Sequence, residues 1–295
     1  MRLIAATWQP IWHDTPEGWL TRYREALTAL EADRDTLMVF PEYTALEATF
    51  YGEVTRDAPL DAKAWMARGA DHFDAYCAGI RSLVQDTGAT ILGGSGFARK
   101  GDAFVNRALF CAPEGEAWLE KQMPTPYERA LDMVAGDAMP VLDTRFGKVA
   151  AVICYDSEFP LISRRCAEAG AEILLVPSCT DTEQGASRVE IGCRARALEG
   201  QMIVAMAPLV GEVPQCEVID VNLGQARVFC PPDGAAPADG TLARGPRNAP
   251  GFAIVDDLSE SLAMAKASVE VSVSRHWPES ETDANPGVLP VLCLK

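Results

Sequence analysis

Residues 148–160 read Lys148-Val149-Ala150-Ala151-Val152-Ile153-Cys154-Tyr155-Asp156-Ser157-Glu158-Phe159-Pro160. The first half of this stretch is almost wholly apolar, which is typical of a strand whose two faces are both covered. Residues 172–177 repeat the apolar pattern, and a helical pattern at 160–169 separates the two runs. Buried strands that alternate with helices predict an α/β protein.

The same alternation extends along the chain in both directions. We expect strands at 3–7, 36–40, 90–93, 201–207 and 252–255, and helices at 18–32, 61–87, 183–199 and 258–267. Strands at 105–111 and 117–122 flank a turn and predict a hairpin. The glycine- and proline-rich residues 214–250 contain weak strand patterns and are interpreted as an excursion within the fold in preference to a domain boundary. We expect one domain over 1–273 and an irregular tail over 274–295 that packs on a neighbouring subunit.

Composition excludes several classes of protein. The 295 residues include 42 acidic and 26 basic side chains, a net charge of −16, which disfavours nucleic-acid binding because that needs clustered positive charge. No apolar run approaches the roughly 18–20 residues of a membrane span. The first ten residues do not resemble a signal peptide, so we expect a cytoplasmic protein with no membrane partner. The acidity is interpreted as a solvated surface in preference to a sign of a cationic substrate.

The cysteines and histidines do not indicate a disulfide framework or a metal site. Nine cysteines, an odd number, are spread through a long chain without a C-x-x-C pair, and the three histidines lie far apart. A close-spaced zinc site therefore has little support. The default interpretation of each cysteine is a small buried apolar residue.

Three polar residues lie at the ends of predicted strands. Glu42 follows the strand 36–40, Lys121 lies at the end of the second hairpin strand, and Cys154 ends the apolar run quoted above. Each alone suits a strand terminus or the core. Together they form a chemical unit, because a carboxylate can deprotonate a thiol and an ammonium stabilises a thiolate or an oxyanion. The sequence holds no nucleophile elbow, P-loop or dinucleotide motif, and no histidine ends a strand.

Three segments carry a family resemblance. Phe40-Pro41-Glu42-Tyr43, Lys121-Gln122-Met123-Pro124-Thr125-Pro126-Tyr127-Glu128 and Ile153-Cys154-Tyr155-Asp156-Ser157-Glu158-Phe159-Pro160 resemble, in this order, the catalytic blocks of the nitrilase superfamily, the carbon-nitrogen hydrolases. Supporting similarity extends over residues 2–267. The resemblance implies a four-layer α-β-β-α sandwich, homodimers or larger assemblies, and neither a metal nor an organic cofactor.

The resemblance also implies roles for individual residues. Cys154 matches the nucleophile, Glu42 the general base, Lys121 the cation at the tetrahedral intermediate, and Glu128 a second carboxylate that orients the site. The backbone N–H of Tyr155 matches a second oxyanion donor. The chain departs from the family where many relatives carry histidine and leucine, at Met123 and Pro124. Proline lacks an N–H donor, so this departure bears on substrate preference.

The expected reaction is hydrolysis of a small amide to an acid and ammonia or an amine, through a thioester on cysteine. Nitriles and carbamoyl compounds are alternative substrates for the same three groups. A non-catalytic binding or scaffold protein and a thiol redox protein, with Cys166 or Cys179 as resolving cysteine, remain alternatives of other classes. Cys179 is also the best rival nucleophile, although no glutamate and lysine blocks accompany it. Residues that suit either substrate binding or packing are Tyr43, Tyr127, Phe159, Cys179 and Thr180.

Overall fold

Two six-stranded sheets form the centre of the computed structural model, which describes residues 1–52, 60–267 and 271–280. The first sheet has the order β14-β1-β2-β3-β4-β5, and the second β13-β12-β9-β8-β7-β6. The first comprises β1 (Arg2–Thr7), β2 (Thr36–Val39), β3 (Thr90–Lys100), β4 (Ala103–Ala112), β5 (Gly115–Glu120) and β14 (Gly251–Val255). The second comprises β6 (Leu142–Thr144), β7 (Gly147–Ala151), β8 (Ile173–Ser178), β9 (Ile203–Pro208), β12 (Gln225–Phe229) and β13 (Thr241–Arg247).

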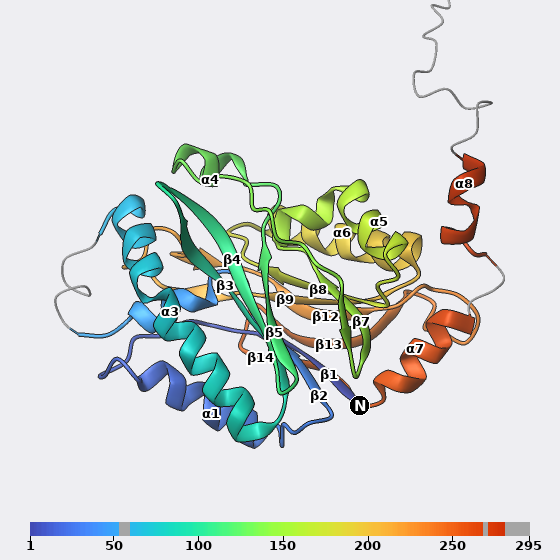
Figure 1. The fold of residues 1–295 in the computed structure, drawn as a ribbon, viewed down its shortest axis with the longest axis horizontal. Helices are drawn as coiled ribbons and strands as arrows, with labels where there is room; N and C mark the ends of the chain where they lie inside the picture. The colour runs from blue at the N-terminus through green and yellow to red at the C-terminus, as the bar shows by residue number, and fades with distance from the viewer. Residues whose placement is uncertain (53–59, 268–270, 281–295) are drawn as a thin grey trace, which may run out of the picture.

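Helices cover the outer face of each sheet. Figure 1 shows α1 (Gly18–Ala29) and α3 (Ala62–Thr87) outside the first sheet, and α5 (Pro160–Glu168) and α6 (Glu183–Gly200) outside the second. The helix α7 (Leu258–Ala267) lies beside the N-terminus, where the Leu258 N–H donates to the carbonyl of Met1. The expected four-layer α-β-β-α sandwich is confirmed.

The core follows from alternation along the strands. Leu3 and Ala5 of β1 pack in one buried cluster with the second sheet, and Ile4 and Ala6 pack in another that contains the apolar faces of α1 and α3. Successive side chains of a strand point to opposite faces, and both faces are covered here. The strand therefore contains no polar side chain between Leu3 and Ala6, which explains the continuous apolar runs in the sequence.

Shorter elements connect these layers. They are η1 (Thr44–Thr49), α4 (Pro126–Ala130), η2 (Cys154–Glu158), β10 (Gly211–Glu212), β11 (Val221–Asn222), η3 (Ser274–His276) and α8 (Trp277–Ser280). Within the described ranges no helix has the length and apolar character needed to cross a membrane.

Three expectations need correction. The strand expected at 90–93 continues to Lys100, because a register shift between Leu92 and Ser95 absorbs the glycines that seemed to end it. Residues 214–250 contain the whole of β11, β12 and β13, so this excursion adds two strands to the second sheet. Residues 274–280 are helical and not irregular, while 281–295 lie outside the described residues. The hairpin, and the helices at 160–169, 183–199 and 258–267, are confirmed within two residues.

Candidate active site

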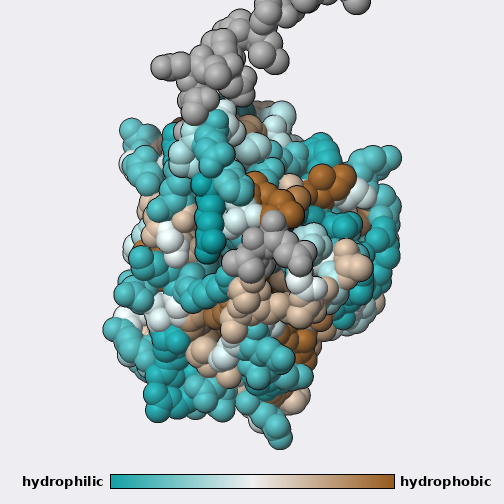
Figure 2. All heavy atoms as spheres, turned by 90° about the vertical axis from the view of Figure 1, so that its right-hand side faces the viewer, coloured by the Kyte–Doolittle hydropathy of each residue, from teal (hydrophilic) through white to brown (hydrophobic). Residues whose placement is uncertain are grey.

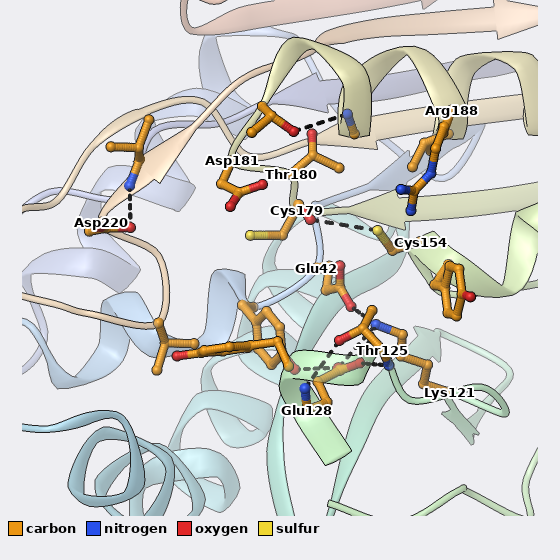
Figure 3. Close-up of a pocket in the computed structure, with 18 of the residues that line it drawn as sticks. Glu42, Lys121, Thr125, Glu128, Cys154, Cys179, Thr180, Asp181, Arg188 and Asp220 are labelled. Carbon is orange, nitrogen blue, oxygen red and sulfur yellow. Dashed lines mark hydrogen bonds and ion pairs between the residues drawn. The ribbon is translucent and has the colours of Figure 1, made fainter. Parts of the chain in front are cut away.

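Glu42, Lys121 and Cys154 converge from both sheets. Glu42 follows β2, Lys121 comes directly after β5, and Cys154 is the first residue of η2 beyond β7. Figure 3 shows Glu42 between the Cys154 sulfur and the pair formed by Lys121 and Glu128. The sequence prediction that these three residues meet is consistent with this placement.

A close backbone approach holds the segment that carries Glu42. The N–H of Ser95 donates to the carbonyl of Pro41 (3.2 Å), and the N–H of Tyr43 donates to the Ser95 hydroxyl (3.2 Å). Gly94 permits this contact, because it has φ +75° and a Cβ there would lie 2.2 Å from the Pro41 oxygen. Tyr43 itself is left-handed, with φ +58°. The loop after β2 is therefore fixed against β3.

Cys154 adopts a conformation that few residues other than glycine adopt. Its φ is +49°, and such a conformation costs of order 1–3 kcal/mol and persists only where the surrounding structure imposes it. Ser157 donates a hydrogen bond from its hydroxyl to the Cys154 carbonyl (2.7 Å), and the sulfur donates to the Cys179 carbonyl (3.6 Å). Left-handed residues of this kind cluster at functional sites.

Lys121 is buried between two carboxylates. Its ammonium donates to Glu42 Oε1 at 2.8 Å and to both oxygens of Glu128 at 3.0 and 2.8 Å, and all three side chains are at most 3% exposed. Glu128 is the N3 residue of α4, where its carboxylate accepts the Thr125 N–H (2.7 Å) in a capping box. The short helix therefore fixes the direction of the second carboxylate.

Two donors near this trio were not singled out from the sequence as parts of it. Asn106, in β4, donates from Nδ2 to Glu42 Oε1 (2.8 Å) and Glu128 Oε1 (3.2 Å). Tyr43, expected only as a substrate-binding residue, donates its hydroxyl to Glu128 Oε1 at 2.5 Å. The signal for Asn106 is an amide inside a strand that is otherwise expected to be buried, although spacing alone gives it no partner.

Burial and the uneven supply of donors separate the two carboxylates. Burial raises the pKa of Glu42, since it outweighs the attraction of Lys121. Burial also acts on Glu128, but Lys121 and the hydrogen bonds from Tyr43 and Thr125 outweigh it and lower its pKa. Titratable pairs whose pKa values are driven apart are typical of acid–base sites.

The pKa values of the cation and of the thiol are both raised, for different reasons. Burial opposes the charge of Lys121, yet the two carboxylates outweigh burial and raise its pKa. Burial raises the pKa of the Cys154 thiol well above its usual value, and the charge of Glu42 adds to this rise. The resting site therefore holds a neutral thiol, so that a reaction at the sulfur requires a base.

A cavity of about 300 Å³ opens onto these groups. It is lined by all but one of the residues expected to be catalytic or substrate-binding; these are Glu42, Tyr43, Lys121, Tyr127, Glu128, Cys154, Tyr155, Cys179 and Thr180. Phe159 is the exception, because its ring packs edge-on against Tyr155 with centroids 4.9 Å apart. We interpret Phe159 as support for the wall. The volume is at the small end of ligand pockets.

The rival cysteines have other hydrogen-bond partners, although Cys179 lines the same cavity. Cys179 donates from its sulfur to Asn222 Oδ1 (3.2 Å), and burial raises its thiol pKa. Cys166 is buried on α5 and donates to the carbonyl of Ile162. Glu42 hydrogen-bonds Lys121 and lies next to Cys154, which gives the latter a base and a cation together. In the described part of the chain no group of three His, Cys, Asp or Glu side chains has a metal-binding arrangement.

The family model for carbon-nitrogen hydrolases matches residues 4–231 of the chain. Among curated proteins, the probable hydrolase YhcX of Bacillus subtilis is 34% identical over 214 residues, which cover 71% of this chain and 40% of that protein. The deaminated glutathione amidase of Mus musculus is 43% identical over 76 residues, or 26% of this chain and 24% of that protein. The chain thus spans less than half the length of these curated relatives.

Among solved structures, Saccharomyces cerevisiae Nit3, described as a member of branch 10 of the nitrilase superfamily, superposes with a TM-score of 0.70. The match covers 94% of this chain and 97% of Nit3 at 17% sequence identity. At that identity the likeness shows a shared fold.

Proposed function

The chain belongs to the carbon-nitrogen hydrolase family, and from that premise we propose that it hydrolyses a small amide through a thioester on Cys154. One observation carries the proposal: the thiol shares its cavity with a buried ammonium that is held by two carboxylates of opposite pKa shift. Relatives that are named amidases support an amide as the substrate.

The first step forms the thioester. Glu42 accepts the thiol proton as the Cys154 sulfur attacks the carbonyl carbon, and the carbonyl oxygen takes the electron pair. The Lys121 ammonium and the Tyr155 N–H stabilise this oxyanion. When the tetrahedral intermediate collapses, the C–N bond breaks and Glu42 returns the proton to the departing ammonia or amine.

The second step releases the acid. Glu42, again ionised, accepts a proton from water while the water oxygen attacks the thioester carbon. The C–S bond then breaks, and the sulfur regains a proton from Glu42. Each proton that leaves one group is thus taken up by another, and no co-reactant other than water is needed.

The two carboxylates divide the work between them. Glu42 has a raised pKa, which makes it a better proton acceptor near neutral pH. Glu128 has a lowered pKa and accepts hydrogen bonds from Tyr43, Asn106 and Lys121. We assign it the role of holding the ammonium in place, since an acceptor so fully engaged is a poor base.

The Cys154→Ala and Glu42→Gln variants test this assignment. Both are expected to fold and to lose amide hydrolysis, measured as ammonia release over a panel of small amides, nitriles and carbamoyl compounds. Cys230→Ala is the control, because Cys230 is buried outside the cavity. Activity of Cys154→Ala within about tenfold of wild type contradicts the proposal. A nitrile or carbamoyl compound as the best substrate keeps the chemistry and changes the substrate class.

The other classes of function make different predictions. A non-catalytic scaffold requires that no member of the panel is turned over and that Cys154 reacts with iodoacetamide no faster than the other cysteines. A redox protein requires a disulfide between Cys154 and Cys179 or Cys166 under mild oxidant. The hydrogen bond from Cys179 to Asn222 supports neither the scaffold nor the redox function.

We also propose that the chain forms a homodimer or a larger homo-oligomer. Three large apolar side chains are exposed on α5 and α6, namely Leu161 (65%), Ile191 (67%) and Leu198 (45%). On the face that carries α7 and α8, apolar side chains gather near the middle of a mainly hydrophilic surface (Figure 2). Light scattering with sedimentation measures the assembly. A single domain over 1–273 and a cytoplasmic location stay predictions.

A further inference from the structure

One buried carboxylate of the cavity region has no part in the reaction described above. Asp156, on η2, is 1% exposed. Its Oδ1 accepts the backbone N–H of Met123 at 2.7 Å, and its Oδ2 accepts those of Gln122 at 3.0 Å and Ile153 at 3.2 Å. Three backbone donors therefore end on one side chain.

These donors belong to the two segments that present the ammonium and the thiol. Gln122 and Met123 follow Lys121 directly, and Ile153 directly precedes Cys154. The strands before these segments, β5 and β7, lie in different sheets. Strand pairing therefore does not fix one segment relative to the other, whereas the Asp156 carboxylate joins them.

We propose that Asp156 is a positioning residue that sets where the Lys121 ammonium lies relative to the Cys154 sulfur. This inference rests on the proposed function, because the separation matters only if the two groups act on one substrate carbonyl. A misplacement of about 1 Å at a reacting centre can cost on the order of 100-fold in rate. An ionised carboxylate suits this role because its two oxygens accept all three bonds.

Charged and titratable groups face Asp156 from two elements besides its own. Lys121, directly after β5, attracts the carboxylate, and Cys166 on α5 lies close enough that the charge of Asp156 raises the pKa of its thiol. Burial raises the pKa of Asp156 to about 6. Because the pKa of Glu42 is raised as well, acidification does not separate the two carboxylates, and a substitution is needed.

The test is Asp156→Asn, an isosteric change that replaces one acceptor oxygen by an NH2 group facing backbone donors. The rate of iodoacetamide reaction is measured for every cysteine of the folded full-length chain at pH 8, by peptide mass spectrometry, together with the melting temperature. Asp33→Asn is the matched control, because Asp33 accepts the Asp35 N–H in a turn before β2 and outside the cavity. We expect at least a tenfold slower reaction at Cys154 in Asp156→Asn only.

A purely structural role gives the opposite signature. Looser packing speeds the alkylation of buried cysteines such as Cys166 and Cys193 and does not slow Cys154. A folded Asp156→Asn variant whose Cys154 reacts within twofold of wild type overturns the inference. If wild-type Cys154 reacts no faster than the other cysteines, the proposed function fails instead.

A second variant covers a failure of Asp156→Asn to fold. Asp156→Glu keeps the charge and both oxygens but moves them by one methylene group. A folded Asp156→Glu protein with slower alkylation at Cys154 supports the positioning role, and one with the wild-type rate overturns it. With an amide substrate in hand, kcat is expected to fall while KM stays within about twofold.

Discussion

Lys121→Met removes the charge that two buried carboxylates share. Methionine keeps most of the volume and apolar stem of lysine, so the change isolates the ammonium. Glu42 and Glu128 are then left at most 3% exposed without their common cation. The expected result is a folded, inactive and destabilised protein.

The structure sets the size of the loss. Breaking a buried ion pair by removing one partner costs about 3–5 kcal/mol. Unfolding entropy near the melting point is about 2.1 cal/mol/K per residue, or roughly 0.6 kcal/mol/K for 295 residues. The melting temperature at pH 8 should therefore fall by about 5–8 °C.

The pH dependence of this loss has a definite sign. In the wild type the lowered pKa of Glu128 contributes stability above its unfolded pKa, and this stability is lost as the pH falls through the folded value. Without Lys121, burial and mutual repulsion raise the pKa of both carboxylates, so the folded variant binds protons more tightly than the unfolded chain. Its deficit is largest at pH 8 and shrinks toward pH 5.

Calorimetry from pH 5 to pH 8 measures this trend, with Lys63→Met as the matched control. Lys63 pairs with Asp132 on the surface, where the side chains are 58% and 81% exposed, and such pairs often contribute nothing measurable. Two results would refute the reasoning: an unchanged melting temperature of Lys121→Met at pH 8, or a deficit that grows on acidification.

Three further predictions concern the neighbours of this trio. Tyr43→Phe removes a donor to the Glu128 carboxylate and should lower the free energy of unfolding, measured in urea, by about 1.5–3 kcal/mol. The loss of kcat should be smaller than in Glu42→Gln. An unchanged free energy of unfolding would contradict a stabilising hydrogen bond between Tyr43 and Glu128. Gly94→Ala places a Cβ 2.2 Å from the Pro41 oxygen at a residue with φ +75°. The change should lower the free energy of unfolding by at least about 1–2 kcal/mol and slow the alkylation of Cys154. Gly101→Ala is the control for the backbone conformation alone, because Gly101 also has a positive φ but has open space around it. A neutral amide should exceed its matched anionic analogue by at least about tenfold in kcat/KM, and by less at high salt. The reason is an excess of negative charge around the cavity, because Arg188 is already paired with Glu158. Three carboxylates that line the cavity have no cation partner among the described residues; these are Asp181, Glu217 and Asp220. A preference for the anionic amide would show that Arg188 leaves Glu158 to bind substrate.

The residue patterns predicted the α/β class and the candidate site residues for physical reasons, whereas the four-layer arrangement was implied by the family resemblance. Strands buried on both faces, such as β7 and β8, leave continuous apolar runs, and helices between them leave a 3.6-residue period. Polar residues at strand ends stand out against such runs. Glu42, Lys121 and Cys154 were therefore visible as candidates before any contact between them was known.

What the sequence did not reveal depends on contacts between distant segments. Asn106 joins Glu42 and Glu128 from 64 and 22 residues away, and no spacing rule connects an amide in a strand to two carboxylates. The bounds of β12 and β13 were not predicted, because glycine and proline leave only weak strand patterns in this segment, although β12 pairs with both β9 and β13. Tyr43 suited packing or ligand contact until its hydroxyl was placed on Glu128.

The difference between the two carboxylates follows from the donors that surround them. A single buried carboxylate beside a lysine has its pKa lowered and becomes a poor base. Here a second carboxylate competes for the ammonium, and Tyr43 and the Thr125 N–H favour Glu128 alone. Lys121 and Asn106 both donate to the same oxygen of Glu42, Oε1, and the Cys154 thiol is a further hydrogen-bond partner. The donors that keep Glu128 charged thus leave Glu42 with the raised pKa that proton transfer from Cys154 requires. Removing the donors to Glu128 and removing the donors to Glu42 should each lower activity, and the two changes should shift the acid limb of the pH profile in opposite directions.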